Sequence, residues 1–150
     1  MVLLKGFLLA TQGTLISANM AIKRKKVIHV GGGLHHAHFK GGSGFCVYND
    51  IGLACKYLLD YYPSVVKKIL IIDLDAHQGN GHERDKEILG NSLIIADIYN
   101  SFIFPRDEYA KKFIDYERLV SGKNSSSEYL EKLDSLLQEI EEYLYELFKK

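Results

Sequence analysis

The segment IIDLDAHQGNGH, residues 71–82, joins an apolar stretch to two aspartates, a histidine and a Gly-x-Gly turn. Side chains at alternating positions of an extended segment point to the same side, so Asp73, Asp75 and His77 are expected to share one face. A carboxylate and an imidazole two residues apart form a compact oxygen and nitrogen pair for a divalent ion such as zinc. The two glycines let the backbone turn away sharply. The segment therefore predicts a metal or acid–base site at the end of a strand.

The same acidic side chains also have a purely structural interpretation. Asp73 and Asp75 can cap the element that follows or accept hydrogen bonds from nearby backbone N–H groups. Short motifs such as D-x-D-x-H also have a substantial false-positive rate. The string alone leaves metal binding and local capping equally open.

The apolar residues before the aspartates indicate a strand. Residues 67–75, KKILIIDLD, form a continuous apolar segment, the pattern of a central strand that is covered on both faces. Residues 92–99, SLIIADIY, form a second segment of this kind. Residues 27–30, VIHV, are β-branched and end at three glycines, which predicts a short strand, and residues 116–121 are a weaker strand candidate.

Helical patterns occur in three places. Residues 14–23 repeat apolar side chains at helical spacing, and residues 48–62 place them on one stripe after an N-cap at Asn49 or Asp50. The last helix begins after Ser125, which has a glutamate three positions later in capping-box spacing. Its apolar side chains lie on one face, so we expect one side of this helix to be buried.

This alternation of strands and helices predicts an α/β fold with three layers, α/β/α, around a mainly parallel sheet. A length of 150 residues is enough for one ordinary domain with a sizeable core. Ligands of such sheets collect at the carboxyl ends of the strands. The polar residues that follow the predicted strands at 27–30 and 67–75 are therefore expected to meet there.

The composition argues against several classes of protein. Lys and Arg balance Asp and Glu at 19 each, so the chain has no basic surface for direct nucleic-acid or membrane binding. The N-terminal apolar stretch is interrupted at Lys5, unlike a signal peptide, and no stretch approaches the roughly 18 apolar residues of a membrane span. Two cysteines, Cys46 and Cys55, are too few for a disulfide framework, which favours a reduced, intracellular setting.

A second polar cluster follows the strand predicted at 27–30. His35 and His36 are adjacent in a glycine-rich loop at residues 31–44. A single buried histidine is often just a satisfied core residue, but an adjacent pair at a strand end indicates acid–base chemistry, because imidazole exchanges protons near neutral pH.

The two clusters together predict metal-assisted hydrolysis. If Asp75 and His77 bind the metal, Asp73 remains to orient one of the paired histidines. Other glycine motifs do not match, because GGGLHH lacks the third glycine of a dinucleotide fingerprint and KGGSGF lacks the lysine of a P-loop. The chain contains no G-x-S-x-G, and Cys46 is better explained as a packing residue than as a nucleophile.

Two long segments, GGGLHHAHFKGGSGFCVYNDIGLA at 31–54 and IIDLDAHQGNGHERD at 71–85, closely resemble the zinc-dependent histone deacetylase family, which has the arginase–deacetylase fold. The glutamine and asparagine of DAHQGNGHERD, together with DIYNSFIFPRDEYAK at 97–111, are most similar to the class IV branch of that family. A weaker similarity extends from residue 11 to the last helix, so the resemblance covers nearly the whole chain.

The resemblance implies a role for each residue of the two clusters. Asp75 and His77 would bind Zn²⁺. His36 would be the general base that deprotonates the attacking water, and His35 its electrostatic partner. Asp73 would hold His35.

Three further positions follow from the resemblance. Asn80 stands where many members have an aspartate that holds the second histidine, and because an amide lacks that charge we expect His36 to be less basic than in those members. Phe45, with Gly44 beside it, would line the narrow channel that admits the acylated lysine. Zinc would polarise the amide carbonyl while the histidines deprotonate the water.

The implied substrate is an acetyl- or acyl-lysine in a histone or another protein, and the implied location is nuclear, cytoplasmic or both. An optional second cofactor is K⁺, held in the family by backbone oxygens around Asp73, Asp75 and His77. Neither nucleic acid nor a membrane is an expected direct partner.

One departure from the family concerns the third zinc ligand, because a catalytic zinc normally has three protein ligands. The family takes the third from an aspartate beyond the next strand, and an oxyanion-stabilising tyrosine from further on, so both are expected beyond Lys150. The other aspartates are expected in the wrong places to substitute for it; they are Asp97, Asp107, Asp115 and Asp134.

We therefore interpret residues 1–150 as the central portion of a single catalytic domain, with N- and C-terminal parts missing. Weak zinc binding and little activity are expected of the chain by itself. The alternative is a non-catalytic remnant of the same fold or a partner-binding module.

Overall fold

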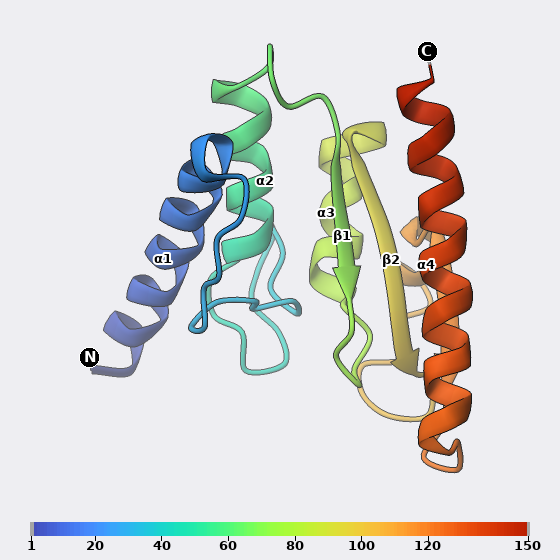
Figure 1. The fold of residues 1–150 in the computed structure, drawn as a ribbon. Helices are drawn as coiled ribbons and strands as arrows, with labels where there is room; N and C mark the ends of the chain where they lie inside the picture. Colours follow the sequence, from blue (N-terminus) through green and yellow to red (C-terminus); the bar gives the residue numbers. More distant parts are fainter. Residues whose placement is uncertain (1, 150) are drawn as a thin grey trace.

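The computed structural model describes residues 2–149 (Figure 1). The helices and strands, in chain order, are α1 (Val2–Arg24), α2 (Asp50–Tyr61), β1 (Ile69–Asp73), α3 (Asn80–Leu89), β2 (Leu93–Asn100), β3 (Tyr116–Val120) and α4 (Ser126–Phe148). Two short 3₁₀ turns are present: Gly90–Ser92 directly precedes β2, and Ala110–Phe113 lies between β2 and β3. None of the helices in this described range has both the length and the apolar character that a membrane crossing requires.

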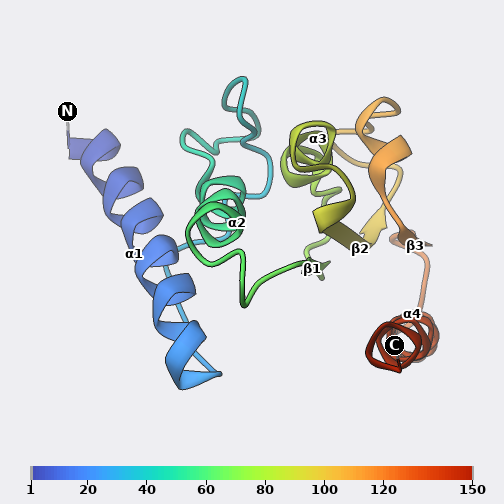
Figure 2. The same ribbon diagram turned by 90° about the horizontal axis from the view of Figure 1, so that it is seen from above.

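The three strands form a parallel sheet in the order β1-β2-β3, with β2 in the middle. α3 and α4 lie on opposite sides of the strands (Figure 2). One core cluster joins β2 to α4 and consists of Ala96, Ile98, Leu136 and Ile140. The second joins the other face of β2 to α2 and consists of Cys55, Leu93 and Ile95. The predicted three-layer α/β/α fold is therefore confirmed.

The helix starts predicted from capping residues are also confirmed. The side chain of Asn49 accepts a hydrogen bond from the Gly52 N–H at 2.8 Å and begins α2. Ser125 begins α4 with a complete capping box, because its hydroxyl accepts from the Glu128 N–H while the Glu128 carboxylate accepts from the Ser125 N–H. Each cap satisfies backbone N–H groups that have no partner inside the helix.

One predicted helix differs in its extent, and one helix of the structure has no counterpart among the predictions. The helix expected at 14–23 begins at Val2, because the apolar and alanine-containing N-terminal stretch consists mostly of good helix formers. α3, at 80–89, was not predicted, since its buried positions carry polar side chains and no apolar stripe marks them. Asn80, His82 and Glu83 are among these buried residues.

The prediction of a strand at 27–30 is wrong for this structure. These residues are extended but pair with no strand among residues 2–149. Ile28 and Val30 are 91% and 94% exposed. A strand requires a neighbour to receive its backbone hydrogen bonds, and β-branched composition alone does not supply one.

The prediction of a central, doubly covered strand at 67–75 also needs correction. β1 covers only Ile69–Asp73 and is an edge of the three-stranded sheet within the described residues. Ile72 and Leu74, two residues apart, are 40% and 51% exposed, so this segment is not covered on both faces either. Apolar side chains report contact above and below a strand, and they carry no information about which strand lies beside it.

Candidate active site

The glycine-rich loop contacts the first turn of α3, just after the segment that follows β1. Gly81, at the start of α3, donates its N–H to the His35 carbonyl at 2.9 Å. A Cβ atom at this glycine would lie 2.2 Å from the carbonyl oxygen of Ala37 and 2.6 Å from that of His35. Only glycine allows the two backbones to approach this closely, and their contact brings the histidine pair to the acidic segment.

Asp50 anchors the other end of the same loop. Its fully buried carboxylate accepts hydrogen bonds from the Gly33 N–H at 2.8 Å and the Leu34 N–H at 2.9 Å. It also accepts from the hydroxyl of Thr14 in α1, at 2.6 Å. The sequence predicts only a capping role for Asp50, whereas the structure uses it to hold the loop that carries both histidines.

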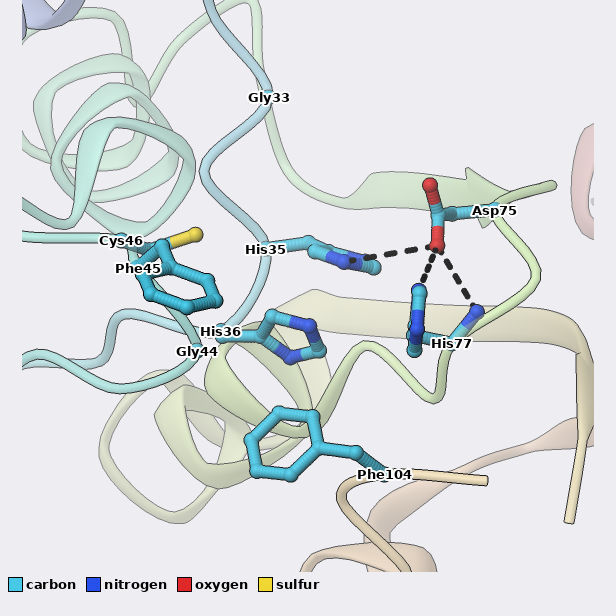
Figure 3. Close-up of a pocket in the computed structure, with 9 residues that line it drawn as sticks. All are labelled: Gly33, His35, His36, Gly44, Phe45, Cys46, Asp75, His77 and Phe104. Carbon is cyan, nitrogen blue, oxygen red and sulfur yellow. Dashed lines mark hydrogen bonds and ion pairs between the residues drawn. The ribbon is translucent and has the colours of Figure 1, made fainter. Parts of the chain in front are cut away.

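A pocket of about 730 Å³ opens at this junction. Figure 3 shows the imidazoles of His35 and His36 on one side of the pocket and that of His77, which follows β1, on the other. Its lining residues are Gly33, His35, His36, Gly44, Phe45, Cys46, Asp75, His77 and Phe104. Six of the residues predicted for the site therefore line one pocket, and the other two, Asp73 and Asn80, contact the histidine pair from behind.

His35 is paired with a carboxylate. Its Nδ1–H donates to Asp73 Oδ2 at 2.7 Å, and its Nε2 lies 3.8 Å from Asp75 Oδ1. Burial lowers the pKa of the His35 imidazole, but the hydrogen bond to Asp73 and the nearby negative charges outweigh it, so this pKa lies above its ordinary value. The structure agrees with the predicted contact between Asp73 and His35.

His36 is paired with an amide. Its Nδ1 donates to Asn80 Oδ1 at 2.8 Å. Burial lowers the pKa of this imidazole, the hydrogen bond to Asn80 only partly opposes the shift, and the neighbouring His35 lowers it further. The two adjacent histidines therefore have pKa shifts of opposite sign.

Asp75 and His77 place two donor atoms side by side. Asp75 Oδ1 lies 2.9 Å from His77 Nδ1, and both side chains are about half exposed to the pocket. A carboxylate oxygen and an imidazole nitrogen are ligand types that zinc accepts, so these two residues would be the ones to hold it. Local capping occurs as well, because Asp73 and Asp75 accept from the N–H groups of Asp75 and His77.

Asp75 and His77 are the two predicted zinc ligands that this chain contains. Within residues 2–149, no group of three or more His, Cys, Asp or Glu side chains is arranged to hold a metal ion. Asp97 is buried against the Gly79 N–H, Asp107 pairs with Arg84, and Asp115 pairs with Lys86. The residues present fit zinc as a partial site, and the predicted third ligand lies outside the described range.

The rim of the pocket is formed by two aromatic side chains. Gly44 has φ 51° and lies so close to His36 that a Cβ atom would be 2.3 Å from the imidazole. Phe45, with φ 63°, projects into solvent beside the pocket and is 99% exposed. Phe104 packs edge-on against His36 with 5.1 Å between ring centroids, and no sequence pattern predicts that role.

Sequence reasoning also misses a polar network under the site. The Gln78 side chain donates to the Asp107 carbonyl at 3.1 Å and accepts from the Asp107 N–H at 2.8 Å. Asp107 forms a two-point ion pair with Arg84 and accepts from the Asn80 amide. Charged residues in a polar helix and loop have the pattern of solvated surface, so nothing in the sequence reveals their convergence.

Two carboxyl groups, Glu83 and Asp97, are fully buried next to this network. Burial raises the pKa of both, and because they contact each other, one proton is shared between them. Among the described residues, Glu83 Oε1 and Asp97 Oδ1 are buried without a hydrogen-bond partner. Asp97 also accepts from the Gly79 N–H at 2.9 Å, which connects this acid pair to the motif after β1.

The parallel sheet and the imidazole and carboxylate groups gathered near the end of β1 define the class as an α/β protein with side chains suited to acid–base chemistry. Residues 3–147 match the family model of the histone deacetylase domain. The chain belongs to this family, as predicted.

Individual relatives agree with the family model. The chain is 42% identical to "Histone deacetylase 2" of Arabidopsis thaliana over 128 residues, which cover 84% of this chain and 32% of the relative. It is 47% identical to "Acetoin utilization protein AcuC" of Staphylococcus aureus (strain MRSA252) over 68 residues, or 45% of this chain and 17% of the relative. The chain therefore spans about a third or less of these relatives.

Proposed function

We propose that this chain is the central part of a zinc-dependent deacetylase domain that hydrolyses the acyl-amide bond of acetyl- or acyl-lysine. The observation that carries the proposal is the convergence of His35, His36, Asp75 and His77 on one pocket. Family membership supports the reaction type, and the substrate class follows from the resemblance. Histones and other nuclear or cytoplasmic proteins are the proposed substrates, and the class IV branch is the proposed subgroup.

Each histidine has a distinct proposed task. His36 Nδ1 is engaged by Asn80, which leaves Nε2 to accept a proton from a water in the pocket. His35, with its raised pKa and its hydrogen bond to Asp73, favours the cationic form and would stabilise developing negative charge on the substrate oxygen. Asp75 and His77 would hold Zn²⁺, which supplies Lewis-acid polarisation of the carbonyl and water when bound.

Phe45 and Phe104 are proposed to guide the substrate. The Phe45 ring is almost wholly exposed at one side of the pocket, and Phe104 closes the other side against His36. Apolar rings at a narrow opening suit the methylene stem of an acylated lysine, which would bury its four carbons between them.

Potassium is proposed as a second, optional cofactor at backbone oxygens around Asp73, Asp75 and His77. The motif resemblance supports it.

A second candidate function is a non-catalytic, partner-binding module. It is supported by the open edge of β1, where Ile72 and Leu74 are exposed, and by the exposed apolar side chains of Ile28 and Val30. It is also supported by the incomplete donor set within the described residues.

Zinc binding and turnover distinguish the two candidates. The chain is dialysed against Zn²⁺, its zinc content is measured by elemental analysis, and hydrolysis of an acetyl-lysine peptide is followed with and without a chelator. We expect weak zinc binding that falls at least about tenfold in Asp75→Asn/His77→Gln and is unchanged in the surface control Asp60→Asn. Any chelator-sensitive turnover would eliminate the non-catalytic candidate, whereas equal zinc in the double variant would refute the metal site.

A further inference from the structure

Asp107 is held in place from several directions behind the histidine pair. Its carboxylate accepts from Arg84 Nε and Nη2, each at 2.8 Å, from the Ala110 N–H at 3.0 Å and from Asn80 Nδ2 at 3.1 Å. Its backbone N–H and C=O are both engaged by Gln78. A side chain with this many partners has one orientation available.

These contacts keep the Asp107 carboxylate ionised. Burial alone would raise its pKa, but the Ala110 N–H, the Asn80 amide and the Arg84 guanidinium together hold the pKa below the ordinary value. An ionised carboxylate only accepts hydrogen bonds. Any group that faces it must therefore present a donor.

That requirement decides which way the amide of Asn80 points. Asn80 is buried, so its side chain has no solvent to satisfy a flipped orientation. Because Asp107 demands a donor, Asn80 turns its Nδ2 group toward Asp107 and its Oδ1 atom toward His36. The orientation of an amide is often ambiguous, and here the carboxylate resolves it.

The orientation of the amide in turn decides the tautomer of His36. Asn80 Oδ1 only accepts, so the neutral imidazole must carry its proton on Nδ1, 2.8 Å away. Its Nε2 atom then keeps the free lone pair that a general base requires. We propose that Asp107 is a positioning residue that sets the tautomer of His36 through the amide of Asn80.

This assignment explains how the site works with an amide at position 80. His35 receives its orientation directly from the carboxylate of Asp73, at 2.7 Å. The orientation of His36 depends indirectly on the Asp107 carboxylate, which acts through the side chain of Asn80. The inference deepens the proposed function, on which the role of His36 as a base rests, but the tautomer itself is a property of the zinc-free chain.

The tautomer is measured by long-range ¹H–¹⁵N correlation NMR of ¹⁵N-histidine-labelled chain without metal, near pH 8, where a free imidazole is neutral. We expect the Nδ1–H form of His36 in the wild type. The Nε2–H form in the wild type would overturn the proposal without any substitution.

Asp107→Asn tests the cause. With its oxygen at the Oδ1 site, the new amide still accepts from Arg84 Nη2 and the Ala110 N–H, and its NH₂ group takes the Oδ2 site beside Asn80 at the cost of the hydrogen bond from Arg84 Nε. This arrangement lets Asn80 flip and favours the Nε2–H form of His36. We expect the share of the Nδ1–H form to fall by about fivefold or more, the equivalent of about one hydrogen bond. The matched control Asp60→Asn removes an exposed carboxylate that pairs with Lys56 and should leave the tautomer unchanged.

A double variant separates positioning from general damage. In Asn80→Asp/Asp107→Asn the acid and the amide are exchanged, so the new carboxylate accepts from His36 and from the new amide, and we expect the Nδ1–H form to return. A folded Asp107→Asn chain that keeps the wild-type tautomer would refute the proposal, as would a double variant that fails to restore it. Because none of these spectra depends on turnover, an inactive chain with the expected tautomers would refute only the deacetylase function.

Discussion

His35 and His36 are adjacent in one loop, yet their hydrogen-bond partners come from two different regions of the molecule. His35 faces Asp73 at the end of β1, and its pKa is raised, while His36 faces Asn80 at the start of α3, and its pKa is lowered. A carboxylate favours the cationic form of one ring, whereas burial beside an amide favours the neutral form of the other. Partners from separate elements therefore give two adjacent and chemically identical side chains pKa shifts of opposite sign.

The backbone contact between Gly81 and His35 joins the histidine loop to α3, and its loss should have the largest effect on stability. In Gly81→Ala the new methyl group would meet the backbone oxygens of His35 and Ala37, so we expect the free energy of unfolding to fall by roughly 3–5 kcal/mol. Urea denaturation followed by circular dichroism measures this loss.

The matched control is Gly6→Ala in α1, where a Cβ atom meets nothing within 4 Å. That variant should be stabilised by about 0.5–1 kcal/mol, because alanine favours a helix interior over glycine. Equal stability of the two variants would show that the contact at Gly81 does not hold the loop.

Asp73→Asn replaces the carboxylate that pairs with His35. The variant removes the charge that His35 faces, so we expect the pKa of His35 to fall and the free energy of unfolding to drop by about 1.5–3 kcal/mol. NMR titration of the zinc-free chain reports the pKa. An unchanged His35 pKa would mean that the raised value has another source.

Asp97, unlike Asp73, is buried beside another acid rather than a histidine, and Asp97→Asn tests the consequence for stability. The pKa of Asp97 is raised in the folded chain, so the unfolded chain releases a proton that the folded chain retains, and stability must fall as pH rises above the ordinary aspartate pKa of about 4. The amide introduced at position 97 can accept from Gly79 and donate to Glu83. We expect a gain of about 1–2 kcal/mol near pH 8.

Unfolding of both proteins at several pH values between about 5 and 8 checks this prediction. The wild type should lose more stability over this window than the variant, although Glu83 still titrates in both, near Asp73 and Asp107. Parallel pH profiles for the two proteins would contradict the shared proton.

Asn80→Asp gives both histidines a carboxylate partner, and its expected effect is a change in the pKa of His36. A carboxylate 2.8 Å from His36 Nδ1 favours the imidazolium, so we expect the pKa of His36 to rise, while Asp107 now faces a like charge. NMR titration measures the shift. If the pKa of His36 stays below that of His35, burial rather than the partner governs it.

Sequence patterns predict this fold where the signal is local or lies on one face. Apolar segments mark β1 and β2, and β3 lies within the weaker candidate at 116–121. Asn49 and Ser125 mark two helix starts, because capping residues report a helix end directly. They fail for residues 27–30, where a strand requires a neighbour. They fail again for α3, whose buried face is polar.

The candidate site divides in the same way. The motif segments contain the donor pair Asp75–His77 and the histidine pair, and their resemblance to a family indicates the role of each. They do not contain the contacts of Phe104 or Asp107, which come from a loop between β2 and β3. Such contacts depend on how distant segments pack, which no local period encodes.

The sequence by itself determined that this is an α/β chain of the histone deacetylase family with acidic and imidazole groups beyond a strand. Tertiary structure alone decided that Asp73 serves His35, that Asn80 and Asp107 serve His36, and that β1 is an edge among the described strands. The physical reason is the distance along the chain over which each effect acts. Periodicity and capping act over a few residues, whereas a pKa and a tautomer depend on charges and hydrogen bonds brought together from separate elements by the fold.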